Sequence, residues 1–160
     1  MKKTLVAYFS VSGTTKEVAT RLAAAAGADL FEIQPEVPYT QDDLDWTNPQ
    51  SRVAREIDNR YSRPKIAGTV GNLSDYEQVY LGFPIWWYTN PTIINTFIEA
   101  HDWGNILIIP FATSDGSKIG KIHRACAEMR RDYPKINWNE GRLLNNPSDK
   151  SLNDWAHQHE

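Results

Sequence analysis

The chain has 160 residues, of which 41% are hydrophobic and 23% are charged, and its formal net charge is −3. These values are typical of a globular protein and exclude a largely disordered or fibrous chain. The mild negative charge, without a basic stripe, argues against nucleic acid as a partner. No apolar run approaches the roughly 20 residues of a membrane span. The single cysteine, Cys126, excludes an internal disulfide, so we expect a cytoplasmic location.

The chain begins with a predicted strand followed by a predicted helix. Residues 5–9 are a continuous apolar run, which is typical of a strand buried in a parallel sheet. Residues 14–26 carry apolar side chains at helical spacing. Thr14 and Glu17 have the spacing of a capping box at the start of this helix, and Gly27 is expected to end it.

Residues 28–33 are the second predicted strand. The stretch that follows, about residues 35–71, is interrupted by four prolines and predicts one polar helix over residues 50–61. A connection of this length inside a compact domain is either functional or loosely ordered. Because we find no repeat and no low-complexity linker, we expect residues 1–160 to form one domain, in which residues 35–71 are an irregular insertion.

The middle of the chain repeats the alternation. Residues 79–83 predict the third strand, and Asn90 with Pro91 predicts a helix start, an N-cap followed by proline at the first helical position. Residues 106–112 form the most apolar predicted strand. Pro110 lies inside that strand, where a proline predicts a bulge or a bend.

Three further elements complete the alternation. Residues 118–131 predict a helix, residues 135–138 a weaker strand, and a last helix begins near Ser148. Strand and helix thus alternate about five times, which predicts an α/β fold with a doubly wound, five-stranded parallel sheet flanked by helices. In such sheets ligands bind at the carboxyl ends of the strands, where the winding direction reverses. The loops after the first, third and fourth strands are therefore the candidate site.

The loop after the first strand places four hydroxyl groups and a glycine within six residues, without a basic side chain. Hydroxyls, backbone N–H groups and a helix N-terminus can together bind a phosphate dianion, and a glycine lets the backbone approach it closely. Hydroxyl side chains also cap helices without any ligand, but the position of this loop at the end of the first strand favours phosphate. The candidates are Ser10, Ser12, Gly13, Thr14 and Thr15.

The loop after the third strand contains three consecutive aromatic residues, Trp86, Trp87 and Tyr88. Neighbouring side chains point in different directions, so at least one of them should be exposed or cover a ligand. A flat heterocycle would suit such an aromatic wall. The loop after the fourth strand offers small polar residues and a glycine, which can form hydrogen bonds with a polar ring edge, although many strand-to-helix turns have this composition.

The three loops resemble the FMN-binding loops of the flavodoxin family through the motifs Ser-x-Ser-Gly-Thr-Thr, Gly-Phe-Pro-Ile-Trp-Trp and Thr-Ser-x-Gly-Ser. The resemblance extends from residue 5 to the last helix and implies the strand order 2-1-3-4-5, with FMN as the cofactor. It places the five residues of the first loop at the FMN phosphate. It places Pro84, Ile85, Trp86, Trp87 and Tyr88 beside the isoalloxazine and ribityl chain, and Thr113, Ser114, Gly116 and Ser117 on the opposite side of the ring.

The same resemblance implies electron transfer through the bound flavin, and in that chemistry no side chain need be catalytic. Two departures from the family pattern leave the reaction open. Typical electron-carrying flavodoxins are strongly acidic, and they tend to have a glycine in the second loop, whereas none lies between Pro84 and Pro91. We keep three alternatives: a carrier for a redox partner protein, an FMN oxidoreductase linked to NAD(P)H or a small quinone, and a cofactor-free flavodoxin-like domain for binding or regulation.

The remaining reactive side chains predict no second site. The four histidines are scattered over helix faces and the C-terminal tail and have no metal-ligand spacing. Cys126 lies on the apolar face of a predicted helix, which indicates a small core residue.

Overall fold

A central sheet organises the computed structural model of the protein, which describes residues 2–114 and 122–160. Its strands follow the order β2-β1-β3-β4-β5, each parallel to its neighbour, and β6 pairs with β4 off this path. The order confirms the predicted doubly wound fold, whereas β6 was not predicted. The strands are β1 (Thr4–Tyr8), β2 (Asp29–Glu32), β3 (Gln78–Pro84), β4 (Leu107–Thr113), β5 (Asn137–Trp138) and β6 (Arg142–Leu143).

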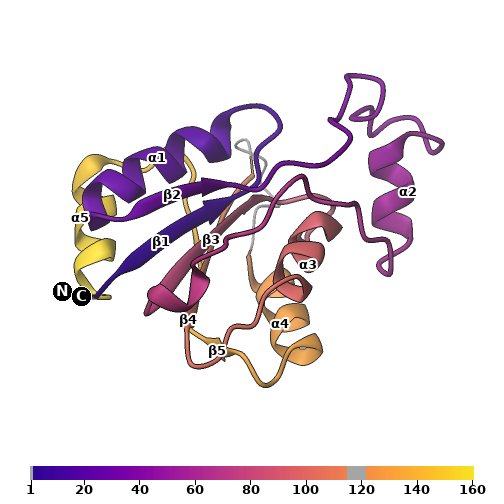
Figure 1. Ribbon diagram of the computed structural model, residues 1–160. Helices are drawn as coiled ribbons and strands as arrows, with labels where there is room; N and C mark the ends of the chain where they lie inside the picture. Colours follow the sequence, from indigo (N-terminus) through magenta and orange to yellow (C-terminus); the bar gives the residue numbers. More distant parts are fainter. Residues whose placement is uncertain (1, 115–121) are drawn as a thin grey trace.

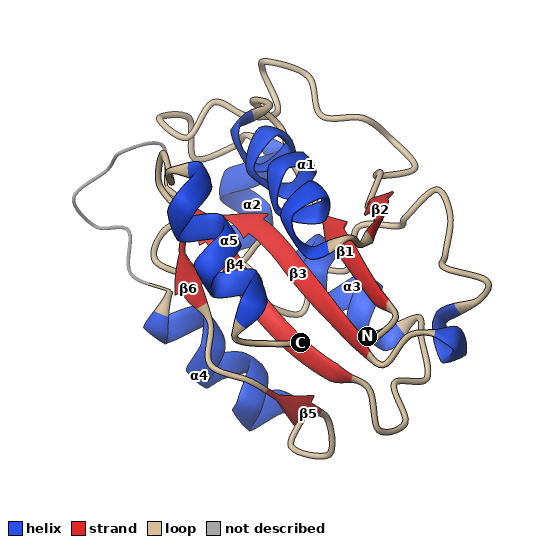
Figure 2. Cartoon of the chain, turned by 90° about the vertical axis from the view of Figure 1, so that its left-hand side faces the viewer, coloured by secondary structure: helices blue, strands red, loops and turns tan. Residues whose placement is uncertain are grey.

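Helices cover both faces of this sheet (Figures 1 and 2). On one face, α1 and α5 pack against each other and share a core cluster with residues of β1, β3 and β4. On the other face, α3 and α4 contribute to a larger cluster. The helices are α1 (Thr14–Ala26), α2 (Arg52–Asp58), α3 (Thr92–Glu99), α4 (His123–Asp132) and α5 (Asp149–His157), with a short 3-10 turn over Leu73–Asp75.

The two central strands explain the apolar runs of the sequence. Every residue of β1 and of β3 is buried, because helices cover the sheet from both sides. For β1 to β4 the observed bounds differ from the predicted ones by a single residue at each end. The polar helix expected over residues 50–61 is the shorter α2, and the helix expected over 118–131 is α4, whose predicted first residues lie outside the described part of the chain.

Pro110 corrects one prediction, since β4 contains no bulge and pairs with β3 in unbroken register from Leu107 to Thr113. The strand that is interrupted is instead the one that pairs with β4 on its outer side. The carbonyls of Ile108 and Ala112 accept hydrogen bonds from that side, from the backbone of Asn139 and Leu144. Pro110 lies between them and has no N–H to donate, so the outer strand is split into β5 and β6 at this position.

Two predicted N-caps were wrong, although α1 spans the predicted residues 14–26. Thr14 is the first residue of α1 and not its N-cap, which is Gly13 without a side-chain cap. The Ser10 hydroxyl caps this helix instead, by accepting a hydrogen bond from the Lys16 N–H in its first turn. The N-cap of α3 is Pro91, one residue later than expected, because the Asn90 side chain turns inward and donates to the Pro91 carbonyl. By contrast, Gly27 ends α1 at a φ of 61°, as predicted.

The C-terminal segment is held against the sheet. Ser148 caps α5 by accepting a hydrogen bond from the Ser151 N–H, in agreement with the predicted start. At the other end of α5, the buried His159 ring lies 2.8 Å from the Tyr80 hydroxyl. No helix in the described part of the chain combines the length and the apolar character needed to cross a membrane.

Candidate cofactor site

Three loops meet where β1, β3 and β4 end. The hydroxyl of Thr15, at the start of α1, lies 2.8 Å from the hydroxyl of Thr113, and this pair is buried. The Ile85 N–H donates to the Thr113 carbonyl at 2.8 Å. Thr113 therefore connects the loop after β1 with the loop after β3. The parallel sheet brings together, at one edge, segments that are about 100 residues apart in the sequence.

The first loop is organised around the Ser10 hydroxyl. Its Oγ accepts hydrogen bonds from the N–H groups of Gly13 and Lys16, each at 3.2 Å. Gly13 has a φ of 93°, and the space beside its Cα is open, with no heavy atom within 4 Å of where a Cβ would lie. Ser12 is exposed and donates to the Thr14 hydroxyl at 3.2 Å.

This donor set fits a phosphate group. The hydroxyls of Ser12 and Thr14 are accessible from solvent, and the first N–H groups of α1 have no acceptor within the helix. A helix of this length also directs the positive end of its dipole toward the loop. Thr15 differs from the other predicted residues, because its buried hydroxyl is already paired with Thr113 and supports the loop from below.

The second loop forms a hairpin turn between Trp86 and Thr89, whose backbones exchange two hydrogen bonds of 2.9 and 3.1 Å. The two central residues, Trp87 and Tyr88, have positive φ values of 47° and 70°. This is the pattern of a type I′ turn, a conformation that strongly prefers Asn and Gly. Two large aromatic residues in left-handed conformations are unfavourable on their own. Surrounding contacts must therefore hold this turn.

The three aromatic side chains of this loop have different surroundings. Trp86 is partly buried and packs edge-on against Phe9 and Tyr39, with ring centroids 5.7 and 5.8 Å apart. Trp87 and Tyr88 retain 39% and 47% of their exposure. The expectation that at least one of the three would be exposed is confirmed. Before them, Pro84 ends β3 in a buried position and Ile85 is partly buried.

The third loop begins with two buried polar residues, Thr113 and Ser114. Asn145 fixes Ser114 from the segment after β6. Its Oδ1 accepts from the Ser114 N–H at 2.9 Å, and its Nδ2 donates to the Ser114 hydroxyl at 2.7 Å. Asn145 was not predicted, and nothing in its local sequence marks it, because its role depends on β6. The predicted contacts Gly116 and Ser117 lie outside the described residues.

The insertion contributes a wall next to the first loop. A cavity of about 330 Å³ opens there, lined by Phe9, Ser10, Val11, Glu32, Gln34, Pro35, Pro38, Tyr39 and Leu44. The Tyr39 hydroxyl donates to Glu56 at 2.6 Å, and the Arg52 guanidinium lies 3.8 Å from the centre of the Tyr39 ring. Burial, with a smaller contribution from Glu56, raises the pKa of Tyr39, so this phenol stays protonated.

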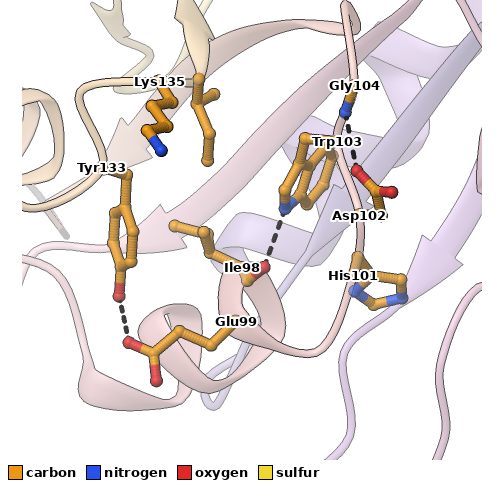
Figure 3. A pocket seen from close by; sticks show the side chains of 9 residues that line it. Ile98, Glu99, His101, Asp102, Trp103, Gly104, Tyr133 and Lys135 are labelled. Atoms are coloured by element: carbon orange, nitrogen blue, oxygen red, sulfur yellow. Dashed lines mark hydrogen bonds between the residues drawn. The ribbon is translucent and has the colours of Figure 1, made fainter.

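A second cavity, of about 370 Å³, is lined by residues from the end of α3, the segment between α3 and β4, and the segment after α4 (Figure 3). Several of its polar groups are already paired. Tyr133 donates to Glu99, the Trp103 ring N–H donates to the Ile98 carbonyl at 2.8 Å, and Asp102 accepts from the Gly104 N–H. This cavity belongs to the packing between α3 and the end of α4 and is far from the three loops.

The titratable side chains outside the three loops include Cys126 and His101, which are held within the fold. Within residues 2–114 and 122–160, no three His, Cys, Asp or Glu side chains are placed to hold a metal ion. Cys126 is a buried free cysteine, as predicted, and burial raises the pKa of its thiol. His101 accepts from the Val70 N–H at 2.9 Å and lies 2.7 Å from the Phe97 carbonyl, so its ring connects the insertion to α3.

The strand order and the three loops at the carboxyl edge define the flavodoxin-like class of α/β protein. The sequence profile of the flavodoxin family matches residues 3–159, and the chain belongs to this family.

Solved structures of similar chains agree with this assignment. A putative flavoprotein from Bacteroides eggerthii DSM 20697 is 44% identical, with a TM-score of 0.92 over 99% of this chain and 98% of that chain. A putative flavoprotein from Bacteroides uniformis ATCC 8492 is 46% identical, with a TM-score of 0.92 over 98% of each chain. A flavoprotein from Lactobacillus acidophilus NCFM in complex with FMN shares the fold at 21% identity, with a TM-score of 0.76 over 98% of this chain and 99% of that chain.

One curated relative is an uncharacterized NAD(P)H oxidoreductase, YcaK, of Escherichia coli (strain K12), which is 30% identical over 79 residues. The match covers 49% of this chain and 33% of that protein, so the chain spans about a third of the length of this relative.

Proposed function

We propose that the protein binds FMN at the three loops and transfers electrons through it. The observation that carries the proposal is the meeting of the loops at Thr113, which bonds to Thr15 on one side and to Ile85 on the other. Membership of the flavodoxin family and the FMN complex of the Lactobacillus relative support FMN as the cofactor.

In this proposal each loop binds a different part of FMN. Ser10, Ser12, Gly13, Thr14 and Thr15 form the phosphate end, with the Ser12 and Thr14 hydroxyls and the helix N–H groups in place of a cation. The Thr15 hydroxyl supports this loop through Thr113. The second loop lies beside the ring and ribityl chain, and the exposed faces of Trp87 and Tyr88 are available for stacking. Thr113 and Ser114 lie on the opposite side. FMN supplies the redox chemistry when bound, while the chain binds it, orients it and excludes water.

The test is the visible spectrum of the purified protein, followed by titration of the apoprotein with FMN. We expect flavin absorbance or, for the apoprotein, quenching of FMN fluorescence at one site per chain. A colourless protein that binds no added FMN would overturn the proposal and favour the third alternative, a cofactor-free domain for binding or regulation.

A second candidate function is an FMN oxidoreductase that takes electrons from NAD(P)H and passes them to a small quinone. The similarity to the relative named NAD(P)H oxidoreductase favours it. The glycine-free turn at Trp87 and Tyr88 also favours it, because two side-chain-bearing residues at positive φ leave less freedom for backbone rearrangement during single-electron steps.

Reductive titration and turnover separate the two candidates. Uptake of electrons in two resolved single-electron steps, without NAD(P)H consumption, identifies a carrier for a redox partner protein. Consumption of NAD(P)H with a quinone acceptor identifies the reductase. We place either activity in the cytoplasm, since the single cysteine is free and buried and this state suits a reducing compartment.

A further inference from the structure

Arg60, in the insertion, directs its hydrogen bonds to the loop after β3. Its guanidinium donates to the Asn90 carbonyl at 2.8 Å and, through its other terminal nitrogen, to the Thr89 hydroxyl and the Asn90 side-chain oxygen at 3.3 Å each. The side chain is partly buried, and among the described residues it forms no direct ion pair; the main opposite charge that acts on it, Glu128, is reached through Thr89. A partly buried guanidinium whose hydrogen bonds all go to neutral acceptors of one turn indicates a role in holding that turn.

The acceptors of Arg60 form the base of the strained turn. Thr89 closes the turn through its two backbone hydrogen bonds with Trp86. The Thr89 hydroxyl also donates to Glu128 of α4 at 2.9 Å, so Thr89 is held from the insertion on one side and from α4 on the other. Thr89 and Asn90 are buried to 2% and 1% exposure. The turn tip, by contrast, is open to solvent.

We propose that Arg60 is a positioning residue for the cofactor site. Its hydrogen bonds to Thr89 and Asn90, which we call the clamp, attach the base of the turn to the insertion. They thereby fix the positions of the Trp87 and Tyr88 side chains. Both residues have positive φ, a conformation that persists only when the surroundings impose it. A planar guanidinium is suited to this task, because it donates to several acceptors at fixed angles, whereas a lysine amine is a point charge. The inference rests on the proposed function for its effect on FMN, but not for the clamp itself.

Arg63 provides a matched control from the same segment. Its guanidinium pairs with Glu99 at the end of α3, at 3.0 and 3.1 Å, and donates to the backbone carbonyls of Arg60 and Ser62 at 2.9 and 2.8 Å. None of these hydrogen bonds goes to the turn at residues 86–89. Arg63→Ala therefore loosens the insertion but keeps the hydrogen bonds of the Arg60 guanidinium to Thr89 and Asn90. If Arg60 only attaches the insertion to the body of the protein, Arg60→Ala and Arg63→Ala should behave alike.

The experiment uses two readouts on the wild type, Arg60→Ala, Arg60→Lys and Arg63→Ala. The first needs no cofactor: the ¹⁹F NMR signal of Trp87 in the 5-fluorotryptophan-labelled apoprotein, assigned with Trp87→Phe. The second is the FMN dissociation constant together with the midpoint potential of the bound flavin. We expect Arg60→Ala to shift or broaden the Trp87 signal, to weaken FMN binding about tenfold and to move the potential. Arg60→Lys should be intermediate, and Arg63→Ala should resemble the wild type.

Three results with Arg60→Ala or its control would overturn the clamp, two of them in the Trp87 signal. One is an unchanged Trp87 signal in Arg60→Ala; the other is the same change in Arg63→Ala. A loss of stability in Arg60→Ala, without a change in FMN affinity or potential of the folded protein, would also overturn it. If Arg60→Ala does not fold, Arg60→Lys decides, and wild-type values in that variant refute the proposal. A wild type that binds no FMN refutes the proposed function, while the Trp87 signal still tests the clamp.

Discussion

Two loops at the carboxyl edge of the sheet, the one after β1 and the one after β3, differ in what holds their shape. In the first, the positive φ falls on Gly13, and the hydrogen bonds of Ser10 stay within seven residues of sequence. In the second, positive φ values fall on Trp87 and Tyr88, and the support comes from Arg60 and from α4.

The difference shows that one site can combine a loop whose conformation is set by its own residues with a loop whose conformation is set by distant residues. The first loop has a shape that its own residues prefer, as suits a loop that offers backbone N–H groups to an anion. The second loop has a shape that its own residues disfavour, and the fold imposes it. Strain of this kind collects at functional sites, where side-chain placement matters more than local stability.

The largest effect should come from the first loop. We expect Ser12→Leu to weaken FMN binding about 100-fold, because it removes a donor to the phosphate and adds a bulky apolar group beside it. The fold should survive, since Ser12 is exposed. Fluorescence titration with FMN measures the affinity, and Thr20→Leu, on an exposed part of α1, is the control. Wild-type affinity in Ser12→Leu would show that this loop does not bind the phosphate.

The next effect tests whether the first loop depends on its glycine. Gly13→Val should lower the free energy of unfolding by about 2 kcal/mol, because a β-branched residue strongly disfavours a φ of 93°. Nothing lies within 4 Å of the new Cβ, so the cost comes from the backbone alone. Gly68→Val is the control, since Gly68 is equally open but lacks a positive φ. Equal losses in urea unfolding of both variants would refute the local explanation.

One hydrogen bond that supports the first loop is long-range, the pair between the hydroxyls of Thr15 and Thr113. Its removal tests how far the first loop depends on contacts outside its own sequence. Thr15→Val keeps the shape of the side chain but leaves the buried Thr113 hydroxyl without its partner at 2.8 Å. We expect a loss of about 1–2 kcal/mol in the free energy of unfolding. Thr15→Ser retains the hydroxyl and should recover most of this loss. A neutral Thr15→Val would mean that the two loops are not coupled through this pair.

Local and distant control also explain what the sequence could predict. The buried strands and α1 follow from apolar runs and helical spacing, and the three loops follow from motifs at strand ends. The prediction of a capping box at Thr14 failed because Ser10 caps the helix across a loop, a pattern that local spacing does not reveal.

The residues that sequence reasoning missed act at long range. Asn145 meets Ser114 across 31 positions, and Arg60 meets Asn90 across 30. The strand β6, which places Asn145, has two residues and carries no detectable periodicity. The positive φ at Trp87 and Tyr88 opposes local preference, so no propensity argument could have found this turn.

The smallest expected effect is a gain in the stability of the apoprotein, whereas most mutations lower stability. Replacing Trp87 by Asn and Tyr88 by Gly installs the pair that type I′ turns prefer. The apoprotein should become more stable by about 1 kcal/mol, because relief of backbone strain outweighs the loss of half-exposed aromatic surface. FMN binding should weaken in the same variant, since the aromatic side chains available for stacking are gone.

Trp46→Asn, at an exposed position without positive φ, controls for loss of an aromatic side chain. An apoprotein that is less stable in urea unfolding would show that the turn is not strained, and the contrast between the two loops would then fail.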